Sequence, residues 1–206
     1  MIDLYFWKTN NGYKARQAVE ETGLDYQLKI IDLSKKEQFS PDYLAISPGH
    51  KIPALIDDDG PGGTKVTLFE SGAILKYVAE KAGSDIYPDD PVRRVNVDQW
   101  LFYGSATFTT HAQQLGLFKL RFPEDVPAAK KHYENQYLDM CGIFDKRLAD
   151  NEYLAGEEYS IADIATYPDI HWHTYYDVAI DDFPNLVRWH DAIEARPAVQ
   201  RAWAEI

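Results

Sequence analysis

The apolar pattern of this chain changes once along its length, and that change limits the possible folds more than any other feature. In the first part, segments that alternate with a period of two, such as Ile2, Leu4 and Phe6, are separated by segments with helical spacing. After residue 91 only helical spacing remains. The sequence therefore predicts a domain of strands and helices followed by a domain of helices alone.

The first part of the chain predicts the element order βαβαββα. The expected strands are residues 2–7, 26–33, 52–56 and 65–69, and the expected helices are residues 13–22, 41–46 and 71–82. Helices connect the first three strands, whereas a turn rich in Gly and Asp connects the last two. This order predicts a mixed sheet with helices packed on it.

The segment 83–91 contains one glycine and two prolines and is expected to be a linker. The expected domains are therefore an α/β domain at 1–82 and an all-α domain at 92–206. In the second domain we expect helices at 92–108, 128–148, 161–179 and 185–195, with a further break at Arg196-Pro197. Ser160 and Asp163 have the spacing of a capping box at the start of the third of these helices.

Charge and hydropathy exclude several classes of protein. The 206 residues include 33 acidic and 21 basic side chains, and a formal net charge of -12 disfavours binding to nucleic acid or to anionic membranes. No apolar run approaches the roughly 20 residues of a membrane span. The first residues show no basic, apolar and small-residue pattern of an export signal. We expect a soluble, cytoplasmic protein that binds neither nucleic acid nor membrane.

The chain has a single cysteine, Cys141, so it can form neither an internal disulfide nor a Cys-x-x-Cys redox pair. Cys141 falls on an apolar helical stripe, which predicts a buried core thiol. Any sulfur chemistry must therefore come from a ligand. His171 and His173 are two residues apart and would point in different directions on a helix, so that no metal site is expected from this pair.

Three segments of the first domain are candidates for one ligand site. Residues 8–11 form a polar segment between the first strand and the first helix, where amides and the helix dipole favour an anion or a thiolate. The loop 47–53 contains a proline that could be cis, and the turn 69–72 precedes another helix. Taken singly, the last two could merely begin a strand and cap a helix. Their combination, in this order and spacing, indicates a ligand site.

These segments resemble the glutathione transferase family, and the chain is most similar to its bacterial Nu class, which is similar to the yeast prion nitrogen regulator. The resemblance extends along essentially the whole chain and is carried by IDLYF, GLDY, YLAISPGHKIPAL, LFESGAILKYVAEK and EEYSIADIA. It implies a thioredoxin-like first domain, an all-helical second domain, a homodimer, and glutathione as a bound co-substrate without a metal.

The resemblance also implies roles for individual residues. Glu70 and Ser71 would hold the γ-glutamyl group, and the backbone of Ile52, before Pro53, would pair with the cysteinyl part of glutathione. Thr9 and Asn11 would hydrogen-bond the ligand sulfur, with the choice of main donor left open. The residues implied at the glycine carboxylate are Gln38, His50 and Lys51, and Lys131 is implied to reach the ligand across the dimer.

The activity implied for the Nu class is glutathione-dependent disulfide-bond reduction. Two alternatives remain open at this point. The same bound thiolate could attack an electrophilic carbon or cleave a thioether, or the chain could be a glutathione-binding regulatory protein with little catalysis.

Overall fold

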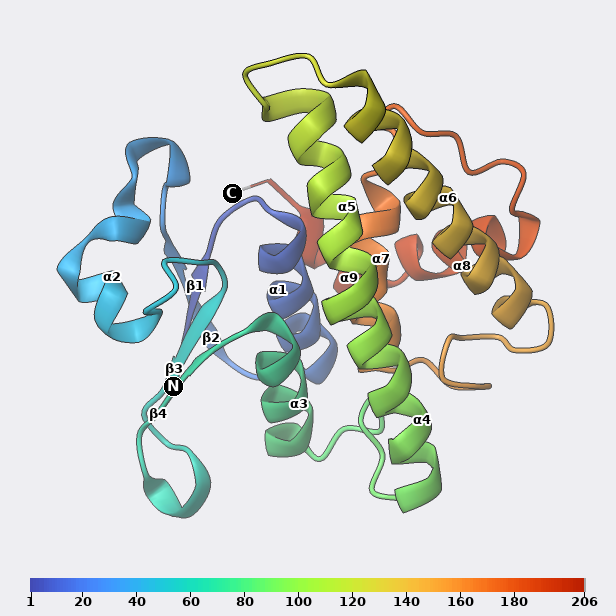
Figure 1. Cartoon of the computed structure of the whole chain (residues 1–206). Coiled ribbons are helices and arrows are strands. Elements are labelled where there is room, and N and C mark those ends of the chain that lie inside the picture. Colours follow the sequence, from blue (N-terminus) through green and yellow to red (C-terminus); the bar gives the residue numbers. More distant parts are fainter. Residues whose placement is uncertain (206) are drawn as a thin grey trace. The chain divides into compact units, whose positions relative to one another are not determined.

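The computed structural model describes residues 1–205 (Figure 1). The strands and α-helices of the first part are β1 (Ile2–Phe6), α1 (Asn10–Thr22), β2 (Tyr26–Ile30), α2 (Pro41–Ile46), β3 (Ala54–Asp57), β4 (Val66–Phe69) and α3 (Ser71–Ala82). They are followed by α4 (Pro91–Phe102), α5 (Thr109–Gly116), α6 (Pro127–Leu148), α7 (Ile161–His171), α8 (Pro184–Glu194) and α9 (Pro197–Trp203). The expected α/β region followed by helices is confirmed.

The four strands form one mixed sheet in the order β2-β1-β3-β4. β1 pairs with β2 in parallel and with β3 in antiparallel orientation, and β3 and β4 form the expected hairpin. The inward-facing side chains of β1, namely Ile2, Leu4 and Phe6, are at most 1% exposed. α1 and α3 pack against each other beside the sheet (Figure 1), which confirms the thioredoxin-like arrangement of the first domain.

Two helices show how local chemistry sets their ends. α1 begins at Asn10, three residues earlier than expected, because the Thr9 hydroxyl caps the helix. Asn11 therefore belongs to the first turn of α1 and not to the preceding loop. The expected capping box at the start of α7 is confirmed, but α7 ends at His171, and turns at 172–177 replace the expected continuation of the helix to residue 179.

The helical region from Pro91 to Arg121 is almost continuous, because α4 and α5 are joined by a π-helical segment at Tyr103–Phe108 and a second one follows α5. Gly104 lies against α7, where an added Cβ would be only 2.4 Å from Oγ1 of Thr166. The close approach of the two helices thus requires glycine at this position. None of the helices formed by the described residues is both long and apolar enough to cross a membrane.

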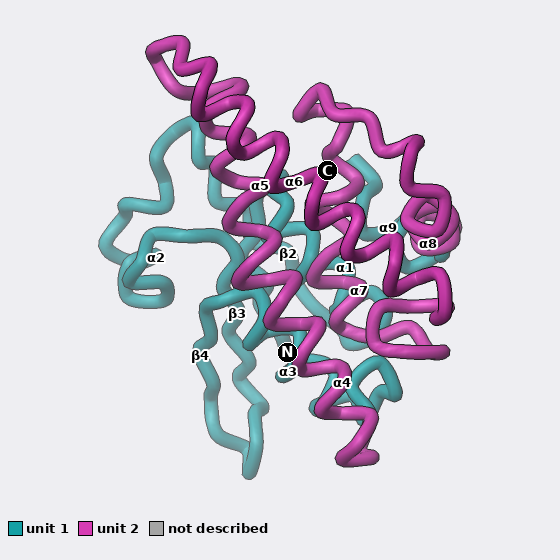
Figure 2. Tube along the Cα trace, turned by 45° about the vertical axis from the view of Figure 1, so that its right-hand side comes forward, with its two compact units in different colours: residues 1–88, 196–206 teal, residues 89–195 magenta. Residues whose placement is uncertain are grey.

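The described chain divides into two compact units, residues 1–88 with the C-terminal segment, and residues 89–195 (Figure 2). The sequence predicts a linker at residues 83–91. Ile86 and Tyr87 within this segment are buried, and the ammonium group of Lys76 lies 4.9 Å from the centre of the Tyr87 ring. The first part of the segment is therefore packed on the first unit.

The C-terminal helix α9 belongs to the first unit, whereas the sequence pattern predicts it in the helical domain. The Trp203 ring stacks on Tyr13 of α1, with ring centres 3.8 Å apart. Arg196 binds the Glu21 carboxylate through Nε at 2.6 Å and Nη2 at 2.8 Å. These contacts join residues that are more than 170 positions apart, so no local pattern predicts them.

Candidate functional site

The register of the sheet brings three chain segments to one edge of the first unit. Tyr5 of β1 pairs with Ala54 of β3, and Ala54 pairs in turn with Phe69 of β4. These three residues form one row across the sheet. The segment after β1, the segment before β3 and the segment after β4 therefore lie next to one another, as the three candidate segments must if they bind one ligand.

The first of these segments is the capped start of α1. Oγ1 of Thr9 accepts a hydrogen bond of 3.0 Å from the amide of Gly12. The hydroxyl proton of Thr9 is not used in this bond and can be donated to a ligand. An added Cβ at Gly12 would lie 2.2 Å from the carbonyl oxygen of Trp7, so glycine lets the first turn of α1 pack closely on the segment that follows β1.

The second segment contains the Ile52-Pro53 peptide bond, which is cis. The preceding carbonyl, that of Lys51, accepts hydrogen bonds from the Tyr43 hydroxyl at 2.6 Å and from Oγ of Ser47 at 2.9 Å. Burial raises the pKa of Tyr43 to about 12, so its hydroxyl remains a proton donor at neutral pH. Tyr43 and Ser47 fix this segment, and no sequence motif reveals them because both bind a backbone atom.

The third segment is the start of α3. Glu70 precedes the helix with φ 73° and ψ 116°, a backbone conformation that residues other than glycine rarely adopt. No side chain among the described residues caps this helix, and the Ser71 side chain is largely buried. The start of α3 therefore offers amide donors, a hydroxyl and the positive end of a helix dipole, next to the exposed Glu70 carboxylate.

Gln38, His50 and Lys51 surround the second segment in a less regular way. The Phe39 and His50 rings are 4.9 Å apart, which places the 3-10 turn Glu37–Phe39 beside the loop that carries His50 and Lys51. His50 and Lys51 are exposed, whereas the side-chain oxygen of Gln38 is buried without a hydrogen-bond partner among residues 1–205. The Gln38 amide can turn to accept from an N–H group or to donate to a carboxylate.

Two further residues lie in the second unit. Lys131 is exposed on α6, and its predicted contact with a ligand across a dimer stays a prediction. Cys141, on the same helix, is fully buried, and burial raises the pKa of its thiol well above the usual range. A buried thiol of this kind is a poor nucleophile.

Comparison with known proteins agrees with this geometry. The model of the glutathione S-transferase N-terminal domain matches residues 2–80, and that of the C-terminal domain matches residues 108–197. The chain belongs to the glutathione S-transferase family. It is 39% identical over 203 residues to the disulfide-bond oxidoreductase YfcG of Escherichia coli, covering 98% of this chain and 94% of that protein. It is also 32% identical to the disulfide-bond oxidoreductase YghU of the same organism, covering 97% and 73%.

Solved structures of family members have the same fold. A glutathione transferase family member from Pseudomonas fluorescens, with two glutathione molecules bound, superimposes with a TM-score of 0.94 at 36% identity, covering 98% of this chain and 91% of that one. A glutathione transferase from Pseudomonas putida, with one glutathione disulfide per subunit, gives 0.93 at 34% identity, covering 98% and 90%. The family expected from the sequence is thus confirmed, while the roles of individual site residues stay predictions.

Proposed function

We propose that this protein binds glutathione in its first unit and uses the bound thiolate to reduce disulfide bonds. The observation that carries the proposal is the row Tyr5, Ala54 and Phe69, which gathers the starts of α1 and α3 and the segment before β3 at one edge of the sheet. The names of the two Escherichia coli relatives, and the glutathione and glutathione disulfide held by the Pseudomonas structures, support the same reaction.

Each end of glutathione has a complementary group in this arrangement. Glu70 accepts from the ligand ammonium, while the Ser71 hydroxyl and the free amides of α3 donate to the adjacent α-carboxylate. The backbone of Ile52 pairs with the cysteinyl residue. The carboxylate of the glycine residue is bound by three side chains, namely Gln38, His50 and Lys51.

The start of α1 holds the sulfur. A free cysteine thiol has a pKa of about 8.5, and each unit by which the pKa falls requires about 1.4 kcal/mol of preferential stabilisation of the thiolate. The unused hydroxyl proton of Thr9, the side-chain amide of Asn11 and the dipole of α1 supply that stabilisation. The first two groups are the donors that we assign to catalysis.

The reaction needs no sulfur from the protein. The bound glutathione thiolate attacks one sulfur of the substrate disulfide, the sulfur–sulfur bond breaks, and the leaving thiolate takes up a proton. A second glutathione thiolate then attacks the glutathione sulfur of the mixed disulfide and releases the second substrate thiol. Two glutathione molecules are thereby oxidised to glutathione disulfide, and one substrate disulfide is reduced to two thiols.

The decisive experiment compares two variants in two assays. Turnover of the mixed disulfide of glutathione and hydroxyethanethiol should remain near normal in Cys141→Ala and fall by about one to three orders of magnitude in the double variant Thr9→Ala, Asn11→Ala, because oriented donors to an anion are lost. Loss of turnover in Cys141→Ala with retention in the double variant would contradict the proposal. Conjugation of chlorodinitrobenzene exceeding disulfide turnover would favour the transferase alternative, and saturable binding without either turnover would favour the regulatory one.

We also propose a cytoplasmic homodimer. Three exposed side chains of α4, namely Val92, Val95 and Phe102, lie on one face of the helix and are 72%, 67% and 60% exposed in the single chain. A second copy would cover this face, and the cytoplasm would supply reduced glutathione. Light scattering at micromolar concentration should report twice the mass of one chain, and a monomer mass would contradict the dimer. If the dimer brings Lys131 to the ligand, Lys131→Ala should weaken glutathione binding.

A further inference from the structure

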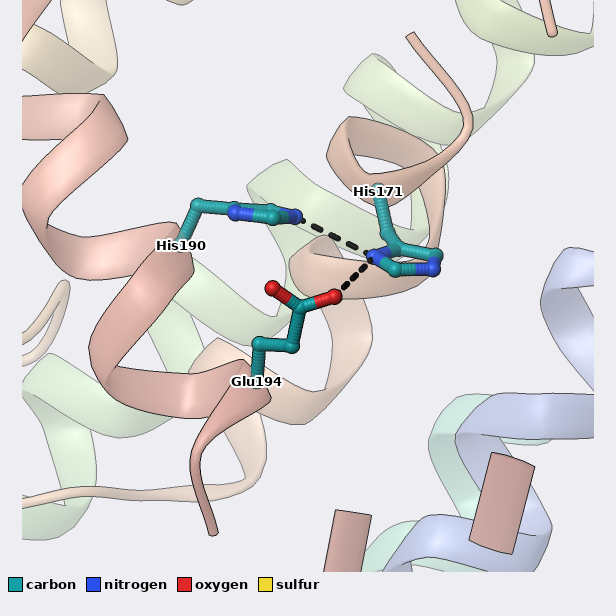
Figure 3. Close-up of side chains that lie close together, drawn as sticks. All are labelled: His171, His190 and Glu194. Atoms are coloured by element: carbon teal, nitrogen blue, oxygen red, sulfur yellow. Dashed lines mark hydrogen bonds and ion pairs between the residues drawn. The ribbon is translucent and has the colours of Figure 1, made fainter. Parts of the chain in front are cut away.

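Two histidines and a glutamate meet within the second unit, where α7 and α8 end (Figure 3). Nδ1 of His171 lies 3.1 Å from Nε2 of His190 and 3.8 Å from Oε1 of Glu194. One ligand atom from each residue lies within 4.8 Å of the other two. None of these residues belongs to the proposed glutathione site.

Local geometry explains why these side chains converge. His190 and Glu194 are four residues apart on α8 and therefore lie on the same face of that helix. His171 is the last residue of α7, and Glu194 is the last residue of α8. The partial negative charges of two helix C-termini thus lie close to the cluster and favour a bound cation.

The hydrogen bonds around the cluster orient its lone pairs. Nδ1 of His190 lies 3.0 Å from the carboxylate of Asp191, so this nitrogen carries the proton and Nε2 presents its lone pair to His171. Histidines that bind a metal through one ring nitrogen commonly donate the other N–H to a carboxylate in this way. The Tyr167 hydroxyl lies 3.0 Å from Nδ1 of His171, the same nitrogen that faces His190 and Glu194, so an ion bound there would displace this contact.

We propose that His171, His190 and Glu194 bind one divalent transition-metal ion of the zinc type. Two imidazoles and one carboxylate are a common ligand set for zinc, and ligand atoms about 2.0–2.1 Å from a tetrahedral ion are about 3.3 Å apart. The separations of 3.1 and 3.8 Å lie on either side of this value, and all three ligand atoms lie within 4.8 Å of one another, so a rotation of the exposed Glu194 side chain would complete the site. Water completes the fourth position, since the side chains of His171 and Glu194 are 27% and 54% exposed.

The ion joins the end of α7 to the end of α8 without taking part in sulfur chemistry. Nitrogen-rich ligand sets select zinc, copper or nickel over the oxygen-preferring ions magnesium and calcium. Cys141 cannot compete for the ion, because its thiol is fully buried.

The test is a titration of untagged, metal-free protein with zinc, and with cobalt as a spectroscopic probe, in the absence of glutathione, whose thiol binds zinc. We expect one ion per chain, the visible absorption of tetrahedral cobalt, and a higher melting temperature with zinc. Zinc binding should withstand excess calcium. Zinc held only by scattered surface carboxylates would instead be displaced by calcium, which prefers oxygen ligands.

Matched variants locate the site. His190→Gln and Glu194→Gln should each weaken zinc binding at least tenfold, which corresponds to about 1.4 kcal/mol, and Asp191→Asn should weaken it by about tenfold. His132→Gln replaces an exposed histidine of α6 and should leave the affinity unchanged. Glu194 is exposed, so its variant tests the site even if His190→Gln fails to fold. Equal affinity in Glu194→Gln and the parent protein, or no saturable binding by the parent, would overturn the proposal.

Discussion

The starts of α3 and α7 use similar residues in opposite ways. At α7, Oγ of Ser160 accepts from the amide of Ala162, and the fully buried Asp163 accepts from four donors. At α3 no side chain among the described residues caps the helix, and Glu70 has a positive φ of 73°. The chain's own side chains cap the start of α7, whereas the backbone amides at the start of α3 have no side-chain cap and can bind a ligand.

The two helix starts therefore have different roles: the start of α7 stabilises the fold, and the start of α3 is available to a ligand. A buried and fully bonded helix start stabilises the fold but has no capacity for a ligand. An uncapped start with a strained residue is less stable in the free protein, and its amides remain available to an anion. The two serines, Ser71 and Ser160, therefore provide a matched pair for experiment.

The largest effect is expected at Asp163. Its carboxylate accepts from the amides of Leu154 and Ser160, from Oγ of Ser160, and from Nε1 of Trp189 at 2.8 Å. Asp163→Ala leaves several buried donors without a partner and should lower the free energy of unfolding by about 3–5 kcal/mol. Urea denaturation measures the loss, and calorimetry on the remaining folded protein should give an unchanged dissociation constant for glutathione.

A smaller effect is expected from acid at Asp57, a buried carboxylate at the end of β3 remote from the ligand edge. Burial opposes its ionisation, but hydrogen bonds from Lys81, Tyr77 and the Asp59 amide outweigh burial and lower its pKa from 3.8 to about 2. The folded state then binds fewer protons than the unfolded state between these values, so stability falls as the pH falls.

About 2 kcal/mol of unfolding free energy should be lost between roughly pH 4.5 and pH 2 because of Asp57. Asp57→Asn should remove this part of the pH dependence, as measured by denaturation at several pH values. An identical acid slope in the variant would show that other carboxylates are responsible.

The matched serines should differ in kind as well as in size. Ser71→Ala should weaken glutathione binding tenfold or more, about 1.4 kcal/mol or above, with little change in stability because Ser71 follows an uncapped start. Ser160→Ala should lower the unfolding free energy by about 1 kcal/mol and leave the glutathione dissociation constant unchanged. If Ser160→Ala weakened glutathione binding and Ser71→Ala lowered stability, the proposed difference between the two helix starts would be wrong.

The smallest effect concerns strain at Glu70. Glu70→Gly relieves the positive φ but makes the unfolded chain more flexible, so the unfolding free energy should stay the same or rise by up to about 1 kcal/mol. Glu70→Ala keeps the strain and provides the control. Both variants lose the carboxylate and should bind glutathione equally weakly in calorimetry. A clear stability loss in the glycine variant alone would argue against strain.

The sequence predicted those features that depend on near neighbours. The span of α3 agrees with the structure, as does the capping box of Ser160 and Asp163, because both follow from residues within one helical turn. The sequence predicts the start of α1 three residues late, since Asn10 and Asn11 are weak helix formers and only the Thr9 cap reveals the turn.

Features that depend on distant residues could not be read from the sequence. The spacing of His190 and Glu194 was visible, but their meeting with His171 depends on how α7 and α8 pack. The support of the Lys51 carbonyl by Tyr43 and Ser47 depends on where α2 lies. The candidate glutathione residues follow from the family resemblance, and the sheet register brings together only those in the segments after β1, before β3 and after β4.

The return of α9 to the first unit has a consequence for the order in which the chain can fold. During synthesis the strands and α1 emerge first, but the surface of α1 that carries Tyr13 and Glu21 receives its partners only when Arg196 and Trp203 have been made. Folding of the first unit therefore cannot be completed from the N-terminus alone. A chain truncated before Arg196 therefore has a first unit without α9, and Tyr13 and Glu21 of α1 lack their partners.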